Sequence, residues 1–162
     1  MAITTDRKNI EDQLEAILSD AVQVVGGKIH RGQHTARDPG DWMELFKVEK
    51  DNTGLYRLHA WEFFRSSITD FRTGTAGVPL NQIRRRHEYT IHGFYGYDPG
   101  KSEDEFQKAV DGVMDKLTST VIIGTALRTM APTCTISIEM MGDVLVHIAD
   151  IKYPVEEQVS GL

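Results

Sequence analysis

The stretch from Ile83 to Leu117 limits the possible folds more than any other part of the chain, because a long strand pattern runs directly into a helix pattern. Between residues 83 and 97 the side chains alternate, so that Tyr89, Ile91 and Tyr95 fall on one face of a strand. The apolar residues that follow recur at helical spacing: Phe106, Ala109, Val110, Val113, Met114 and Leu117. This stripe must be buried against a sheet, and we expect the preceding strand to belong to that sheet.

The start of this helix has its own signal. Ser102 is a favourable N-cap residue, and Glu105 lies three residues later, which completes a capping-box pattern. Glu103 and Asp104 lie where the helix dipole favours negative charge. The sequence therefore predicts a capped helix from Ser102 to Leu117.

The rest of the chain predicts one more helix and two hairpins. A helix ended by two glycines precedes a first hairpin, and a two-residue turn of Gly142 and Asp143 is typical of a second hairpin. The predicted elements are a helix at 6–25, a short strand opened by Ile29, strands at 42–48 and 55–64, and strands at 134–141 and 144–153.

This order of elements predicts an α+β fold, with a mainly antiparallel sheet and two helices packed on one face. Few strands are joined by helical crossovers, and no linker divides the chain, so we expect residues 1–162 to form a single domain. Two segments are left outside this core: an arm-like loop at 65–82 and a polar C-terminal tail at 154–162.

The loop at 65–82 is the first candidate for a functional surface. It is rich in serine, threonine, glycine and arginine, and loops of this length in compact domains tend to be functional. We expect a partner to order it, burying its spaced apolar residues and pairing Arg65 and Arg72 with acids. The apolar residues are Ile68, Phe71, Val78 and Leu80.

Three consecutive arginines, Arg84, Arg85 and Arg86, are the sharpest charge feature. On a strand, Arg84 and Arg86 share one face and Arg85 lies on the other. Three interpretations stay open: protection of an exposed strand edge by charge, docking onto an acidic neighbour that could be another copy, and contact with phosphate.

The charge balance points to protein partners. The formal net charge of −6 argues against a general nucleic-acid binder. Residues 51–97 carry six arginines against four acids, whereas residues 98–162 carry five basic residues against eleven acids. A two-signed molecule of this kind suits contact with copies of itself or with other proteins.

We find no catalytic motif and predict no cofactor and no metal site. His87, Glu88 and His92 are spaced one residue too far for a metalloprotease motif, and a strand would send the two rings to opposite faces. Cys134 is the single cysteine and is expected to be a small core residue in a protein made in a reducing cytoplasm.

The elements together resemble the tail-terminator (tail-completion) proteins of long-tailed bacteriophages. The resemblance lies in the N-terminal amphipathic helix, the early hairpin, the segment from His87 to Leu117 with its Tyr89-x-Ile91-x-Gly93 alternation, and the closing hairpin with the segment from Val146 to Gln158 at its end. It spans most of the chain as a pattern of elements, without a diagnostic motif.

The resemblance implies a structural virion protein without enzymatic activity. Such subunits form a ring, usually of six copies, that caps the tail tube, stops its polymerisation and joins it to the neck. The implied partners are the chain itself, the tail tube protein and a neck or head-closure protein. Phage DNA passes through the ring without sequence-specific binding, and no membrane is involved. The implied location is the tail–neck junction of the virion, after synthesis in the host cytoplasm.

Two other classes stay open. Another phage connector subunit, from the neck or head closure, would share the acidic and motif-free character. A small enzyme would need polar side chains that converge in one pocket.

Overall fold

The computed structural model describes residues 7–33, 39–50, 55–73, 82–121, 123 and 128–159. These residues form a mainly antiparallel sheet with helices against it, which confirms the predicted α+β fold. The elements are α1 (Arg7–Val25), β1 (Lys28–Arg31), α2 (Pro39–Phe46), β2 (Lys47–Lys50), β3 (Leu55–Thr73), β4 (Gln82–Gly96), α3 (Ser102–Ser119), β5 (Arg128–Thr129), β6 (Thr133–Met141) and β7 (Val144–Val159).

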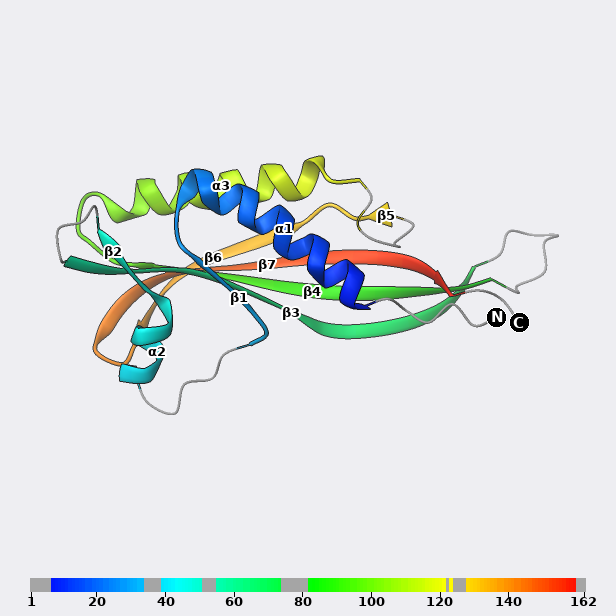
Figure 1. Cartoon of the computed structure of the whole chain (residues 1–162), viewed down its shortest axis with the longest axis horizontal. Helices are drawn as coiled ribbons and strands as arrows, with labels where there is room; N and C mark the ends of the chain where they lie inside the picture. The colour runs from blue at the N-terminus through cyan, green and yellow to red at the C-terminus, as the bar shows by residue number, and fades with distance from the viewer. Residues whose placement is uncertain are drawn as a thin grey trace.

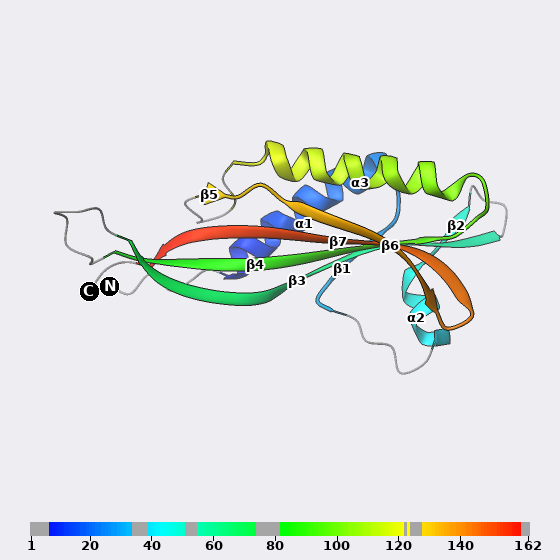
Figure 2. The same ribbon diagram turned by 180° about the vertical axis from the view of Figure 1, so that it is seen from behind.

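Three long strands, β3, β4 and β7, make the centre of the sheet, with β4 in the middle. β1 and β2 pair with the outer edge of β3, and β5 and β6 pair with the outer edge of β7. Helices α1 and α3 cover one face, and α2 lies on the opposite side (Figure 1, Figure 2). Among the described residues, no helix is both long and apolar enough to cross a bilayer.

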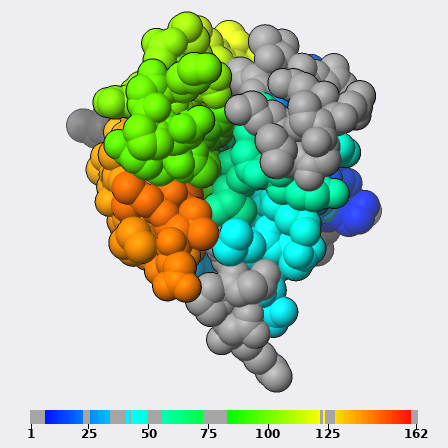
Figure 3. All heavy atoms as spheres, turned by 90° about the vertical axis from the view of Figure 1, so that its left-hand side faces the viewer, coloured from blue at the N-terminus to red at the C-terminus, as the bar shows by residue number. Residues whose placement is uncertain are grey.

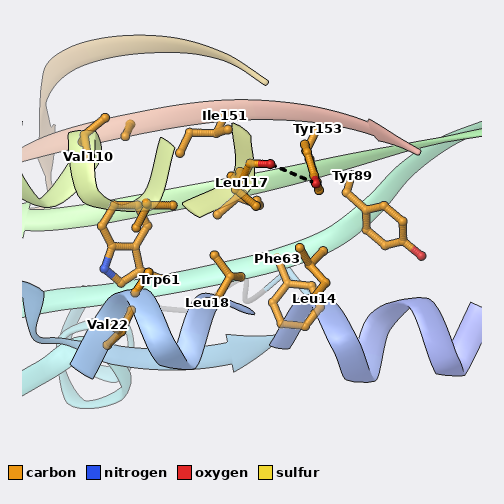
Figure 4. Packing of buried hydrophobic residues seen from close by; sticks show 14 of the residues in the cluster. Leu14, Leu18, Val22, Trp61, Phe63, Tyr89, Val110, Leu117, Ile151 and Tyr153 are labelled. Carbon is orange, nitrogen blue, oxygen red and sulfur yellow. Dashed lines mark hydrogen bonds between the residues drawn. The ribbon is translucent and has the colours of Figure 1, made fainter. Parts of the chain in front are cut away.

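The main core lies between the sheet and the two helices, α1 and α3. Tyr89, Ile91 and Tyr95 of β4 are buried on this face, as their alternation predicted. Figure 4 shows Trp61 of β3 between Val22 of α1 and Val110 of α3. The Tyr153 hydroxyl donates to the Leu117 carbonyl oxygen at 3.2 Å, which ties the last strand to the end of α3.

A smaller apolar cluster lies on the other face, beneath α2. Phe46 is its centre and packs against Phe94, with ring centroids 5.0 Å apart. We predicted a strand at 42–48, and the structure corrects this: α2 runs to Phe46, and the strand begins at Lys47. Pro39 at the first helical position suits a helix start, and an eight-residue helix is too short to give a clear period.

The start of α3 also differs from the prediction. Ser102 does not cap Glu105; its buried hydroxyl accepts the Asp98 N–H at 2.8 Å and lies 2.9 Å from His147 Nε2. The Glu105 carboxylate instead accepts the hydroxyl of Tyr95. The turn before the helix is therefore fastened to β7 through Ser102. Figure 3 views the molecule from the end where this turn lies beside the β6–β7 turn.

Most of the expected loop at 65–82 is strand. Residues 65–73 of β3 continue to pair with residues 82–89 of β4, after a bulge between Arg65 and Ser67. Residues 74–81 lie outside the described part of the chain. Figure 1 shows β3 and β4 running on past the helices, and we call residues 65–73 and 82–88 the arm. Residues 65–73 therefore have backbone partners within the chain.

The expected polar tail at 154–162 is also corrected. Residues 154–159 form the end of β7 and pair with β4 as far as Ile83. Val155, Glu156 and Glu157 are buried, because arginines and a histidine of the arm face the two carboxylates. Residues 160–162 lie outside the described part.

A buried histidine predicts a specific acid sensitivity. His59 is 1% exposed, and its ring packs edge-on against Tyr95 at 4.8 Å. Burial, and then the charge of Arg57, lower its pKa to about 4, although Glu105 acts in the opposite sense. The pKa of a histidine in the unfolded chain is near 6.5. Between about pH 4 and pH 6.5, His59 is therefore protonated in the unfolded chain and neutral in the folded protein.

We expect the stability that depends on neutral His59 to be complete above about pH 6.5 and to fall by roughly 3 kcal/mol as the pH drops to about 4. His59→Leu should reduce this slope without abolishing it, because burial also lowers the pKa of His87 and His147. Urea unfolding at a series of pH values measures the slope. Equal slopes in the two proteins would show that His59 titrates normally.

Candidate assembly surface

A buried carboxylate organises the arginines of the arm. Glu156 of β7 pairs with Arg86 in the strand register and is 0% exposed. Arg86 donates from Nη2 to its Oε1 at 2.7 Å, and Arg128 of β5 donates from Nε to its Oε2 at 2.8 Å. Arg84 Nη1 lies 4.0 Å from the same carboxylate. Three guanidinium groups thus surround one acid, on the sheet face that α1 and α3 do not cover.

The charge of this cluster is fixed at neutral pH. Burial would raise the pKa of Glu156, but hydrogen bonds from Arg86 and Arg128 and their charges outweigh burial and hold it below its usual value. Glu156 is therefore ionised and removes one of three positive charges. An excess of two charges is left on this face, counted over these four residues.

These guanidinium groups are accessible to a partner. The side chains of Arg86 and Arg128 are 41% and 55% exposed, although their acceptor is fully buried. Arg86 also lies over the ring of Phe71 on β3, 5.4 Å from its centroid, which holds it in one orientation. Oriented, half-exposed guanidinium groups are well suited to bind carboxylates or phosphates on another molecule.

The helix side of the arm carries separate ion pairs. Arg85 donates two hydrogen bonds to Asp70 across the β3–β4 pair, at 2.6 and 2.8 Å, and these bonds lower the pKa of Asp70. His87 lies between Arg65 and Glu157, with its Nε2 3.0 Å from the Glu157 carboxylate. Arg84 and Arg86 therefore face one side and Arg85 the other, as strand alternation predicted.

The structure excludes one of the three interpretations of Arg84, Arg85 and Arg86. Edge protection is wrong, because β4 is a central strand whose arginines pair with β3 on one side and β7 on the other. All three arginines have acidic partners within the chain. Replacing all three arginines by glutamate would leave Glu156 buried among carboxylates. That change would damage the fold as well as any interface.

The other predicted contact residues divide into two groups. Ile68 is 46% exposed and Arg72 is exposed, both on the helix side of the arm. Phe71 is half-buried under Arg86. Val78 and Leu80 lie outside the described residues. The structure brings Phe71, Arg84 and Arg86 together and places Ile68 and Arg72 on the opposite side.

Sequence reasoning missed Glu156 and Arg128. Glu156 was assigned to the polar tail because a proline such as Pro154 rarely continues a strand, and Arg128 lies in a two-residue strand that is too short to give a pattern. The apolar alternation through Ala149, Ile151, Tyr153 and Val155 runs past that proline and was the signal that β7 continues.

Two sets of polar side chains are relevant to the alternative that the protein is a small enzyme. Ser102 and His147 are 2% and 1% exposed, and this pair fastens the turn before α3 to β7. On the face that α1 and α3 leave uncovered, His92 Nδ1 lies 2.9 Å from Glu62, and Lys152 bridges Asp150 and Thr90 at 3.0 Å each. This row spreads over three strands and stabilises the sheet.

His87 and His92 do not form a shared site, because they lie on opposite faces of β4. Within the described ranges, no group of three or more histidine, cysteine, aspartate or glutamate residues is placed to hold a metal ion.

A comparison of the sequence with protein-family models finds no match, and a search of curated proteins finds none either.

Proposed function

We propose that this chain is a ring-forming subunit that caps the tail tube of a long-tailed bacteriophage and joins it to the neck. The proposal starts from the resemblance of the element order to the tail-terminator proteins. The observation that carries it is the arm, which extends beyond the helices and presents guanidinium groups held by a buried carboxylate (Figure 1).

The arm is difficult to explain in a protein that acts alone. Strands that extend past the covering helices bury less apolar surface per residue than the body of the sheet, so ordering them brings little stability. Ile68, a large apolar residue, is also left half-exposed there. A neighbouring molecule that covers the arm would supply the missing burial.

The charge distribution favours a neighbour of the same kind. The arm carries five arginines and two acids, in a chain whose net charge is −6. Glu156 and Glu157 of β7 neutralise part of this excess and leave the arm basic. The rest of the chain is correspondingly acidic, so one copy can attract the arm of another.

The growth of tail tubes tests this function. Tube protein from the same phage is allowed to polymerise with and without this protein, and tube lengths and tube ends are recorded by electron microscopy. We expect shorter tubes with added density at one end. Unchanged lengths with bare ends would contradict tube capping, and binding to the head-closure protein alone would assign the chain to another connector position.

An arm variant sharpens the test. Ile68→Glu combined with Arg72→Glu changes two exposed side chains and leaves the Glu156 cluster intact. We expect this variant to melt within a few degrees of the wild type and to lose tube capping. Val121→Glu is the matched control, because Val121 is 69% exposed and lies outside the arm. Equal capping by both variants would show that the helix side of the arm takes no part.

A further inference from the structure

A second exposed surface lies on β6, at the end of the sheet opposite the arm. Ile138 and Met140 are 48% and 61% exposed, and Ile136 beside them is 37% exposed. All three lie on the same face of β6 as Cys134, which packs against the main core. We call these three residues the β6 strip. Within the described sheet β6 pairs only with β7, so its other edge is open.

An open edge strand with a row of apolar side chains promotes association unless something covers it. The charges around the strip indicate what covers it. Glu103 and Asp111 of α3 act electrostatically on His147 and Cys134, the neighbours of the strip on β7 and β6. Asp143 adds a further acid in the β6–β7 turn, whereas Glu139 lies on the opposite face of β6. The surface is therefore apolar with an acidic border.

The arm has the complementary character, since it is basic and carries the half-exposed Ile68. The arm and the β6–β7 turn lie at opposite ends of the elongated molecule in both ribbon views (Figure 1, Figure 2). A chain therefore cannot place its own arm on its own strip. An arm that binds the strip must therefore belong to another copy.

We propose that the β6 strip of one copy is the docking surface for the arm of the next copy in the ring. This inference rests on the ring of the proposed function and specifies its interface. Two unlike surfaces on one chain give a head-to-tail contact, which repeats until the ring closes. The apolar residues supply burial, and the acidic border of the strip selects the arginine-rich arm.

Two defective variants test the pairing. The strip variant carries Ile138→Glu and Met140→Glu, and the arm variant is the one described above. Each lacks one of the two surfaces, so each alone should be a monomer. When the two variants are mixed in equal amounts, the intact arm of the strip variant can bind the intact strip of the arm variant. We expect a dimer of one copy each that grows no further, measured by light scattering after gel filtration.

Each alternative outcome has a definite meaning. Rings formed by the strip variant alone would show that the strip is not the interface. A mixture that stays monomeric would show that arm and strip do not bind each other. Val121→Glu, which changes an exposed apolar residue elsewhere, should form rings like the wild type. Failure of the wild type itself to form a ring would overturn the proposed function, and is thereby distinguished from failure of this interface.

Discussion

Replacing Gly93 by alanine should destabilise the protein by about 3 kcal/mol, at the upper end of the cost of overpacking a core. Gly93 lies on β4 opposite Trp61 of β3. A Cβ atom added at Gly93 would lie 2.5 Å from the Trp61 ring, and two other ring atoms would lie within 2.9 Å. Trp61 is fully buried between α1 and α3, so its ring has no free space to enter.

Gly96 provides a matched control on the same strand. A Cβ atom there would meet Leu58 at 3.5 Å, which is ordinary contact. Because glycine in a strand is less favourable than alanine by about 0.5–1 kcal/mol, Gly96→Ala should be neutral or slightly stabilising. Thermal melting should show a loss of roughly 10 °C for Gly93→Ala alone. Equal melting temperatures would mean that Trp61 does not occupy the space above Gly93.

Replacing Val113 by aspartate should abolish cooperative folding. Val113 lies on the buried face of α3, is 0% exposed and belongs to the main core. An aspartate there must lose its charge or remain unpaired among apolar side chains, and either costs at least about 4 kcal/mol. A domain whose total stability is of the order of 5–15 kcal/mol has little left after such a loss.

Asp111→Ala is the control on the outer face of the same helix. Asp111 is exposed, and alanine is a favourable helix residue, so the free energy of unfolding should change by less than about 0.5 kcal/mol. Far-ultraviolet circular dichroism and thermal melting compare the two variants. Similar melting of both would show that the buried face of α3 is assigned wrongly.

The central unit of the fold could be predicted because its signals are local. The alternation of Tyr89, Ile91 and Tyr95 and the stripe that includes Val113 each follow from burial of one face. The second hairpin was equally clear, since Gly142 occupies a left-handed conformation with φ 64° in the turn.

Residues 65–73 of the arm could not be predicted in the same way. They are mostly polar, so no apolar alternation marks them as a strand. The buried part of β3 and β4 sets the register of their pairing. The bulge after Arg65 shifts this register by one residue. The key acid, Glu156, lies 70 residues from Arg86, a distance at which sequence spacing gives no information.

The mass of the assembled protein in solution tests most directly whether this chain forms a closed ring. Native mass spectrometry over a wide range of protein concentration, alone and with tube protein, measures the number of copies. We predict one closed assembly, expected to contain six copies, whose size does not increase with concentration. A monomer under all conditions, or open chains that lengthen steadily with concentration, would contradict the ring.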